Sequence, residues 1–169
     1  MGVLKTLVAL LLLAACGAAQ AESVRETDLK AAFVYNFMVL TRWPAGMGPS
    51  LKLCVAMGPV PAAVEALAGK WVGERMVVVS TIPSTERAGD CHVLHIPSSQ
   101  APRAKAWLAA VASSPTLTIT EVSDAARQGS MVNLRTLDGR VVFDVDTQAA
   151  AAVQLTLSSQ LVKLAHVRH

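Results

Sequence analysis

The side chains most able to do chemistry in this sequence are cysteines and histidines. Cys54 lies in one apolar segment, and Cys91 opens another, in which His92 and His95 follow it. A cysteine beside a histidine can act as a nucleophile only if its thiol is free. On a β-strand, the spacing of His92 and His95 sends their imidazoles to opposite faces, so we predict structural roles for them rather than a shared metal ion.

Other residue types give weaker chemical signals. His166 and His169 are three residues apart near the C-terminus, where adventitious metal binding is the most we expect. Asp138, Asp144 and Asp146 are predicted to be turn and cap residues, because the EF-hand spacing is absent. The sequence also lacks the serine hydrolase, zinc protease, Walker and dinucleotide-binding motifs. It therefore predicts no catalytic residue, no metal site and no cofactor, and it favours a binding protein over an enzyme.

The N-terminal segment predicts export from the cytoplasm. Lys5 precedes an apolar run of about ten residues, which is the length of a signal peptide core and too short for a membrane-spanning helix. Ala19-Gln20-Ala21 resembles a signal peptidase site, so residues 1–21 are predicted to be a signal peptide. The alternative is a lipobox, Leu13-Ala14-Ala15-Cys16, with cleavage before Cys16. Lipidation of Cys16 would hold the protein at a membrane.

Export also determines the expected state of the cysteines. Cys16 is removed with the signal or lipidated, so Cys54 and Cys91 remain as an even pair. In an oxidising compartment such a pair predicts a disulfide, and two buried free thiols are the alternative. A disulfide would leave the protein without a plausible nucleophile.

Composition predicts one compact domain. About 150 residues remain after the signal, which is enough for one sizeable hydrophobic core. The chain has 15 basic and 12 acidic residues and no run of lysine or arginine. This mild charge balance predicts no nucleic-acid partner. Residues 22–169 are therefore predicted to fold as a single domain.

Hydrophobic spacing and turn residues predict strands that alternate with helices. Ser23-Val24-Arg25-Glu26 forms a capping box for a helix that continues to about Arg42 and is expected to be buried on most sides. Asp138-Gly139 predicts a β-hairpin. Strands are predicted over 51–57, 75–80, 91–96, 117–120, 131–136 and 140–145, and further helices over 61–67, 100–112, 123–129 and 147–167. Ser158-Ser159 indicates an interruption of the last helix. This order predicts an α/β fold, a single-domain sandwich with a mixed sheet flanked by helices, which ends in a β-hairpin and a C-terminal helix.

The first helix contains one polar residue in an apolar context, Asn36. A buried amide must form hydrogen bonds, so Asn36 either bonds a neighbouring main chain or is the polar anchor of a partner or ligand groove beside Tyr35 and Trp43. Trp43-Pro44 either caps the core or anchors an interface. The Tyr35–Pro44 helix end and the hairpin loop are the predicted contact surfaces.

Several segments resemble the YfiR family of periplasmic proteins, over nearly the whole mature chain. The two cysteines match the cysteine pair that this family shares. The segments that carry the resemblance are Ala31-Ala32-Phe33-Val34-Tyr35-Asn36-Phe37, Arg42-Trp43-Pro44, Leu53-Cys54-Val55, Asp90-Cys91-His92-Val93-Leu94, Leu117-Thr118-Ile119, Gly129, Phe143-Asp144-Val145-Asp146 and Leu157-Ser158-Ser159-Gln160-Leu161-Val162-Lys163-Leu164-Ala165.

The resemblance implies a periplasmic repressor without enzymatic activity. Such a repressor sequesters the periplasmic sensor domain of an inner-membrane diguanylate cyclase, which lowers cyclic-di-GMP signalling and restrains biofilm formation. The resemblance also implies a homodimer with an α/β sandwich fold. A periplasmic small-ligand-binding protein and an envelope lipoprotein adaptor are the alternative functions.

Overall fold

The computed structural model describes residues 26–123 and 128–168. The predicted signal peptide over residues 1–21, including the alternative lipidation site Cys16, lies outside the described residues. Most of the predicted helix over 123–129 also lies outside them.

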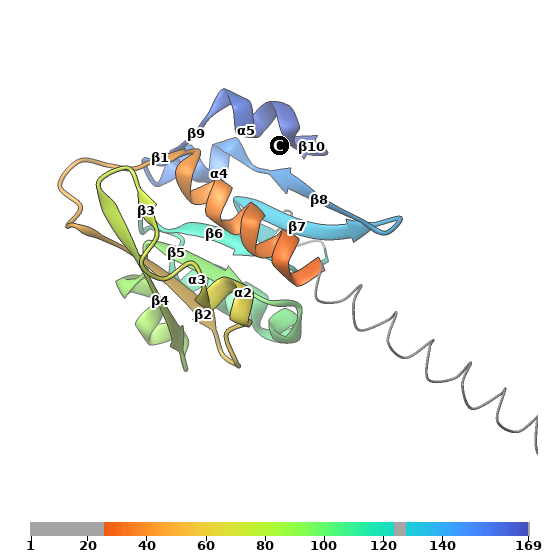
Figure 1. Cartoon of the computed structure of the whole chain (residues 1–169), viewed down its shortest axis with the longest axis horizontal. Coiled ribbons are helices and arrows are strands. Elements are labelled where there is room, and N and C mark those ends of the chain that lie inside the picture. The colour runs from red at the N-terminus through yellow and green to blue at the C-terminus, as the bar shows by residue number, and fades with distance from the viewer. Residues whose placement is uncertain (1–25, 124–127, 169) are drawn as a thin grey trace, which may run out of the picture.

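An eight-stranded mixed sheet forms the centre of the domain (Figure 1). Its strand order is β10-β8-β7-β6-β5-β2-β4-β3. In this order, neighbouring strands from β4 to β7 are parallel. β3 is antiparallel to β4, and β8 is antiparallel to β7. The bounds are β2 Ser50–Ala56, β3 Trp71–Val72, β4 Arg75–Ile82, β5 Val93–Ile96, β6 Leu117–Thr120, β7 Val132–Leu137, β8 Arg140–Val145 and β10 Val167–Arg168. The predicted mixed sheet is confirmed.

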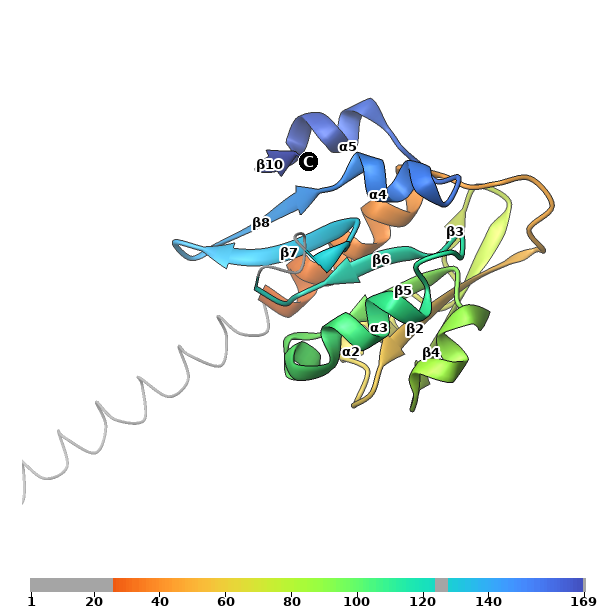
Figure 2. The ribbon, with the colours of Figure 1, turned by 180° about the vertical axis from the view of Figure 1, so that it is seen from behind.

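Helices cover both faces of this sheet (Figures 1 and 2). The first helix, described from residue 26 to residue 39 and called the N-terminal helix below, lies on one face, and α3 (Ala104–Ala110) lies on the other. The remaining elements are α2 (Ala62–Glu65), α4 (Thr147–Ala152), α5 (Ser159–Leu164), the 3₁₀ segments η1 (Thr85–Asp90) and η2 (Ser98–Arg103), and a separate two-stranded sheet of β1 (Thr41–Arg42) and β9 (Thr156–Leu157).

Each face of the sheet carries its own hydrophobic core. The first core lies under the N-terminal helix, where Phe37 packs edge-on against Phe143 of β8 at a centroid distance of 4.9 Å. The second core lies under α3 and contains Trp107, which is completely buried, together with both cysteines. Because both faces of the inner parallel strands β5 and β6 are covered, every residue of these two strands is buried.

The C-terminal segment differs in part from the helix predicted over 147–167 with an interruption at Ser158-Ser159. It forms α4, β9, α5 and β10 in turn. Gln154 has a φ of 64°, which ends the first helix, and the Ser158 hydroxyl accepts a hydrogen bond from the Leu161 amide to begin the second. Pairing of β9 with β1 and of β10 with β8 holds the extended parts. The interruption indicated at Ser158-Ser159 is confirmed, but the strands β9 and β10 were not predicted, because contacts distant in sequence outweigh local helix propensity.

The three aspartates near the hairpin are confirmed in part as turn and cap residues. Asp138 and Gly139 both have positive φ, at 50° and 72°, as a tight hairpin turn requires. Asp146 caps α4 by accepting a hydrogen bond from the Ala149 amide at 2.8 Å. Asp144 instead receives two hydrogen bonds from Arg135 across the hairpin.

Candidate interaction surface

One face of the N-terminal helix is open to solvent. Leu29 and Val39 are 46% and 47% exposed, and Ala32 and Asn36 on the same face are also exposed. Their spacing of three or four residues places them in one line along the helix, which we call the exposed stripe. The prediction that this helix is buried on most sides is therefore wrong for this face, and the Asn36 amide meets solvent instead of a core. The sequence pattern did not reveal the exposed stripe because three of its four residues are themselves apolar.

Tyr35 connects this helix to the edge of the sheet. Its hydroxyl donates a hydrogen bond to the main-chain carbonyl of Trp71 in β3, at 2.7 Å. The Lys70 ammonium lies 5.9 Å from the centre of its ring, within the range of a cation–π contact. Tyr35 therefore holds the β3 segment in place, and its predicted contact with a partner or ligand stays a prediction.

The end of the N-terminal helix is closed by two side chains that follow it. The Thr41 hydroxyl donates to the carbonyl of Phe37 at 2.7 Å, and the Trp43 indole N–H donates to the carbonyl of Met38 at 3.4 Å. Carbonyls in the last turn of a helix have no partner within the helix, so these bonds stabilise its end. The helix ends at residue 39 instead of Arg42, because Thr41 and Arg42 pair with β9.

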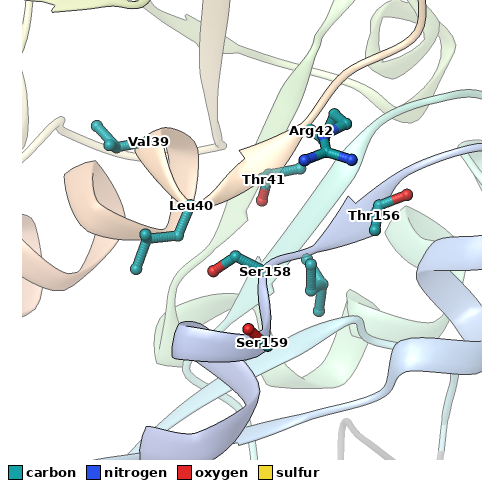
Figure 3. A pocket seen from close by; sticks show the side chains of 8 residues that line it. Val39, Leu40, Thr41, Arg42, Thr156, Ser158 and Ser159 are labelled. Carbon is teal, nitrogen blue, oxygen red and sulfur yellow. The ribbon is translucent and has the colours of Figure 1, made fainter.

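A groove of about 500 Å³ lies between this helix end and the C-terminal segment (Figure 3). The Ser158 amide bonds the Leu40 carbonyl at 2.9 Å and so fixes its two sides relative to each other. Arg42 is exposed. Among the described side chains that line the groove, it is the one that carries a charge. The lining consists of Val39, Leu40, Thr41, Arg42, Thr156, Leu157, Ser158 and Ser159. This is a surface suited to binding, with apolar, hydroxyl and cationic groups but no acid–base pair.

A network of charges anchors the other end of the N-terminal helix to the sheet. The Lys30 ammonium lies 2.8 Å from carboxylate oxygens of both Glu26 and Glu121. His95 Nε2, in buried β5, lies 2.8 Å from the second oxygen of Glu121. Burial alone would raise the pKa of Glu121, but the hydrogen bonds and charges of His95 and Lys30 outweigh it and lower that pKa to about 2. The arrangement places His95 in a packing and anchoring role.

His92, the other histidine that follows Cys91, contacts the main chain. His92 Nδ1 accepts a hydrogen bond from the Lys52 amide at 2.9 Å. Burial, together with the nearby charges of Lys52 and Arg75, lowers the pKa of His92. Among the described residues there is no group of three or more His, Cys, Asp or Glu side chains that could hold a metal ion.

The predicted disulfide between Cys54 and Cys91 is confirmed, with Cα atoms 5.9 Å apart. Both residues are buried in the core under α3. Neither sulfur is therefore available as a nucleophile.

Within residues 26–123 and 128–168, no helix combines the length and the apolar character that crossing a membrane requires.

The predicted contact residues Tyr35, Asn36 and Trp43 do not line the groove, and their contact with a partner or ligand stays a prediction. The predicted surface at the Tyr35–Pro44 helix end includes the residues on one side of the groove, but not Thr156, Ser158 and Ser159 on the opposite side. These hydroxyl residues reach the groove through the pairing of β9 with β1, which joins positions more than a hundred residues apart. Ser158 and Ser159 had two sequence signals, the 157–165 segment of the family resemblance and the indicated helix interruption, whereas Thr156 had none.

Comparisons with known proteins agree with the fold. Residues 27–166 match a family model described as YfiR/HmsC-like. A conserved domain protein from Vibrio cholerae O1 biovar El Tor, strain N16961, has a crystal structure that is similar with a TM-score of 0.57 and 9% sequence identity. The similarity covers 85% of this chain but only 60% of that protein's chain, so it establishes a shared fold and no more. No curated protein shows a significant sequence match.

Proposed function

Because the chain belongs to the YfiR/HmsC-like family, we propose that it is a periplasmic regulatory protein that binds the periplasmic sensor domain of an inner-membrane diguanylate cyclase. Binding covers the sensor surface, keeps cyclic-di-GMP production low and so restrains biofilm formation. This action needs no catalytic group. Residues 1–21 serve as the export signal and residues 22–169 as the regulatory domain, while lipidation at Cys16 is the alternative that would tether the domain to a membrane. The homodimer that the resemblance implies stays a prediction.

The observation that carries this proposal is the continuity of the exposed stripe with the groove. Val39 belongs to both, so an apolar surface runs from Leu29 along the helix and past Arg42. A small molecule would fill the groove alone, whereas a protein domain would cover the stripe as well. This favours a protein partner over the small-ligand alternative. Asn36 lies in the middle of this surface. Tyr35 and Trp43 position the elements on either side of it.

A matched pair of variants tests this surface against the hairpin loop. Val39→Asp/Arg42→Glu places negative charges on the groove, and Leu137→Asp/Arg140→Glu makes the same changes at the exposed hairpin tip. With affinity-tagged mature protein and detergent-solubilised envelopes, we expect the wild type and the hairpin variant to capture a membrane sensor protein with a cyclase domain. Capture by the groove variant should fall at least about tenfold, because charges replace apolar contact at the centre of the interface.

Denaturation of both variants provides the control for folding, since exposed substitutions change stability by about 0.5 kcal/mol or less. Failure of the wild type to recover any membrane sensor protein would contradict the proposed function. Equal capture by the groove variant would place the contact elsewhere on the domain.

A further inference from the structure

Strand β4 is only partly covered at the outer edge of the sheet. Its neighbour β3 pairs with it at Arg75 and Met76. Main-chain hydrogen bonds from the segment before β3 extend this cover to Val77. β4 itself continues to Ile82. No other described strand lies beside its remaining outer residues.

Val79 and Thr81 present main-chain hydrogen-bonding groups at this open edge. The main-chain hydrogen-bonding groups of Met76 and Ile82 point toward the β2 side of the strand. Because successive residues of a strand point these groups to opposite sides, the N–H and C=O groups of Val79 and Thr81 point outward. An open edge of this kind can pair with another extended chain.

An apolar patch lies beside the open edge. Trp71 is 60% exposed, Met76 42% and Val78 41%. Trp71 is directly opposite Met76 in the antiparallel register, and Val78 follows two residues along β4, so the three side chains share one face. The helix α3 covers this face farther toward β5 (Figure 2). The apolar patch is therefore a part of the sheet face without a helix on it.

Positive charge lies on both faces of the sheet at this edge. Lys52 of β2 is in register with Val78 on the face of the apolar patch. The Lys70 ammonium lies over the Tyr35 ring on the opposite face, and Arg75, which alternates with Met76, points to that face as well. None of these three cations forms an ion pair with a described residue. Glu74 in the turn between β3 and β4 supplies one carboxylate, which leaves an excess of positive charge. A second copy of this chain would bring like charges together here, whereas an acidic partner would be complementary.

We propose that the open edge of β4 binds an extended segment of a partner protein that is rich in apolar and acidic side chains. The segment adds a strand through hydrogen bonds to Val79 and Thr81. Its apolar side chains cover Trp71, Met76 and Val78. Its carboxylates alternate with them, so they point to the opposite face of the sheet, toward Lys70 and Arg75. This surface does not include the exposed stripe or the groove, so the two proposals succeed or fail separately.

A peptide titration tests the proposal on the mature protein. The probe is an eight-residue capped peptide of alternating valine and glutamate, and its counterpart alternates valine and lysine. In nuclear magnetic resonance spectra we expect saturable shifts of the Val79 and Thr81 amides and of the Trp71 indole with the glutamate peptide only. Lys70→Glu should weaken binding by about three- to tenfold, while Lys105→Glu, an equal charge change on α3, should leave it unchanged.

Thr81→Pro removes the outward N–H while leaving the hydrogen bonds to β2 intact, and it should abolish binding. If this variant does not fold, Lys70→Glu against Lys105→Glu decides the question. Equal binding of both peptides, shifts confined to another surface, or no saturable shift would overturn the proposal. Edge shifts that grow with protein concentration in the absence of peptide would also overturn it, in favour of pairing with a second copy.

Discussion

Replacing both bridged cysteines, as in Cys54→Ala/Cys91→Ala, should lower the free energy of unfolding by about 4 kcal/mol. The disulfide joins residues 37 positions apart, so its loss frees a long loop in the unfolded chain. Both side chains are also buried in the core under α3, where smaller residues leave unfilled volume. Since single domains are stable by roughly 5–15 kcal/mol, this loss removes between about a quarter and most of the stability. Urea denaturation under oxidising conditions measures the loss.

Reduction of the wild type provides the matching control for this variant. A reductant should destabilise the wild type by a similar amount and leave the double variant unaffected. A loss below about 1 kcal/mol would contradict the assigned role of the bridge, because ordinary substitutions already cost that much. The expected result means that the domain needs an oxidising compartment to be fully stable, which supports the proposed periplasmic location.

Glu121→Gln should cost about 2–3 kcal/mol at neutral pH, because it removes the carboxylate that Lys30 and His95 share. The cost should depend on pH in a defined direction. Folding lowers the pKa of Glu121 from 4.5 to about 2. The ionised carboxylate therefore stabilises the fold fully above about pH 4.5, and this contribution is lost as the pH falls toward 2. The glutamine variant lacks this titration, so the difference in unfolding free energy should narrow over that interval.

Glu65→Gln on the exposed side of α2 is the control, with an expected change within about 0.5 kcal/mol. Denaturant unfolding of the three proteins at several pH values gives the comparison. If the gap between Glu121→Gln and the wild type were the same at pH 7 and pH 3, the charge network would not be the source of the stability.

The parallel strands could be predicted well because their apolar runs are bounded by glycine, proline and turn residues. The predicted bounds of β6 and β8 agree with the structure. Strand β3 was missed because it has only two residues, and its place depends on Tyr35, a residue of a distant element. In the C-terminal segment the sequence indicated only the interruption at Ser158-Ser159. The strands β9 and β10 were missed because the alanines and leucines there have high helix propensity, while pairing with β1 and β8 decides the extended parts.

The candidate site shows the same division between local and distant information. The disulfide followed from cysteine count and compartment, and the helix end was found from unusual residue types, Tyr35, Asn36 and Trp43. The burial of Asn36 was predicted wrongly. Its neighbours in the helix are apolar, and apolar residues on an exposed face look the same in sequence as those in a core. The groove required the β1–β9 pairing, which no local pattern indicates.

Cyclic-di-GMP in living cells tests the proposed regulatory function most directly. The measurement compares cells of the source organism that lack this protein with cells that also carry the wild type, Leu137→Asp/Arg140→Glu or Val39→Asp/Arg42→Glu. We predict that loss of the protein raises the cyclic-di-GMP level, that the wild type and the hairpin variant restore the low level, and that the groove variant does not. An unchanged level in the absence of the protein would contradict the proposed function, and full restoration by the groove variant would contradict the proposed binding surface.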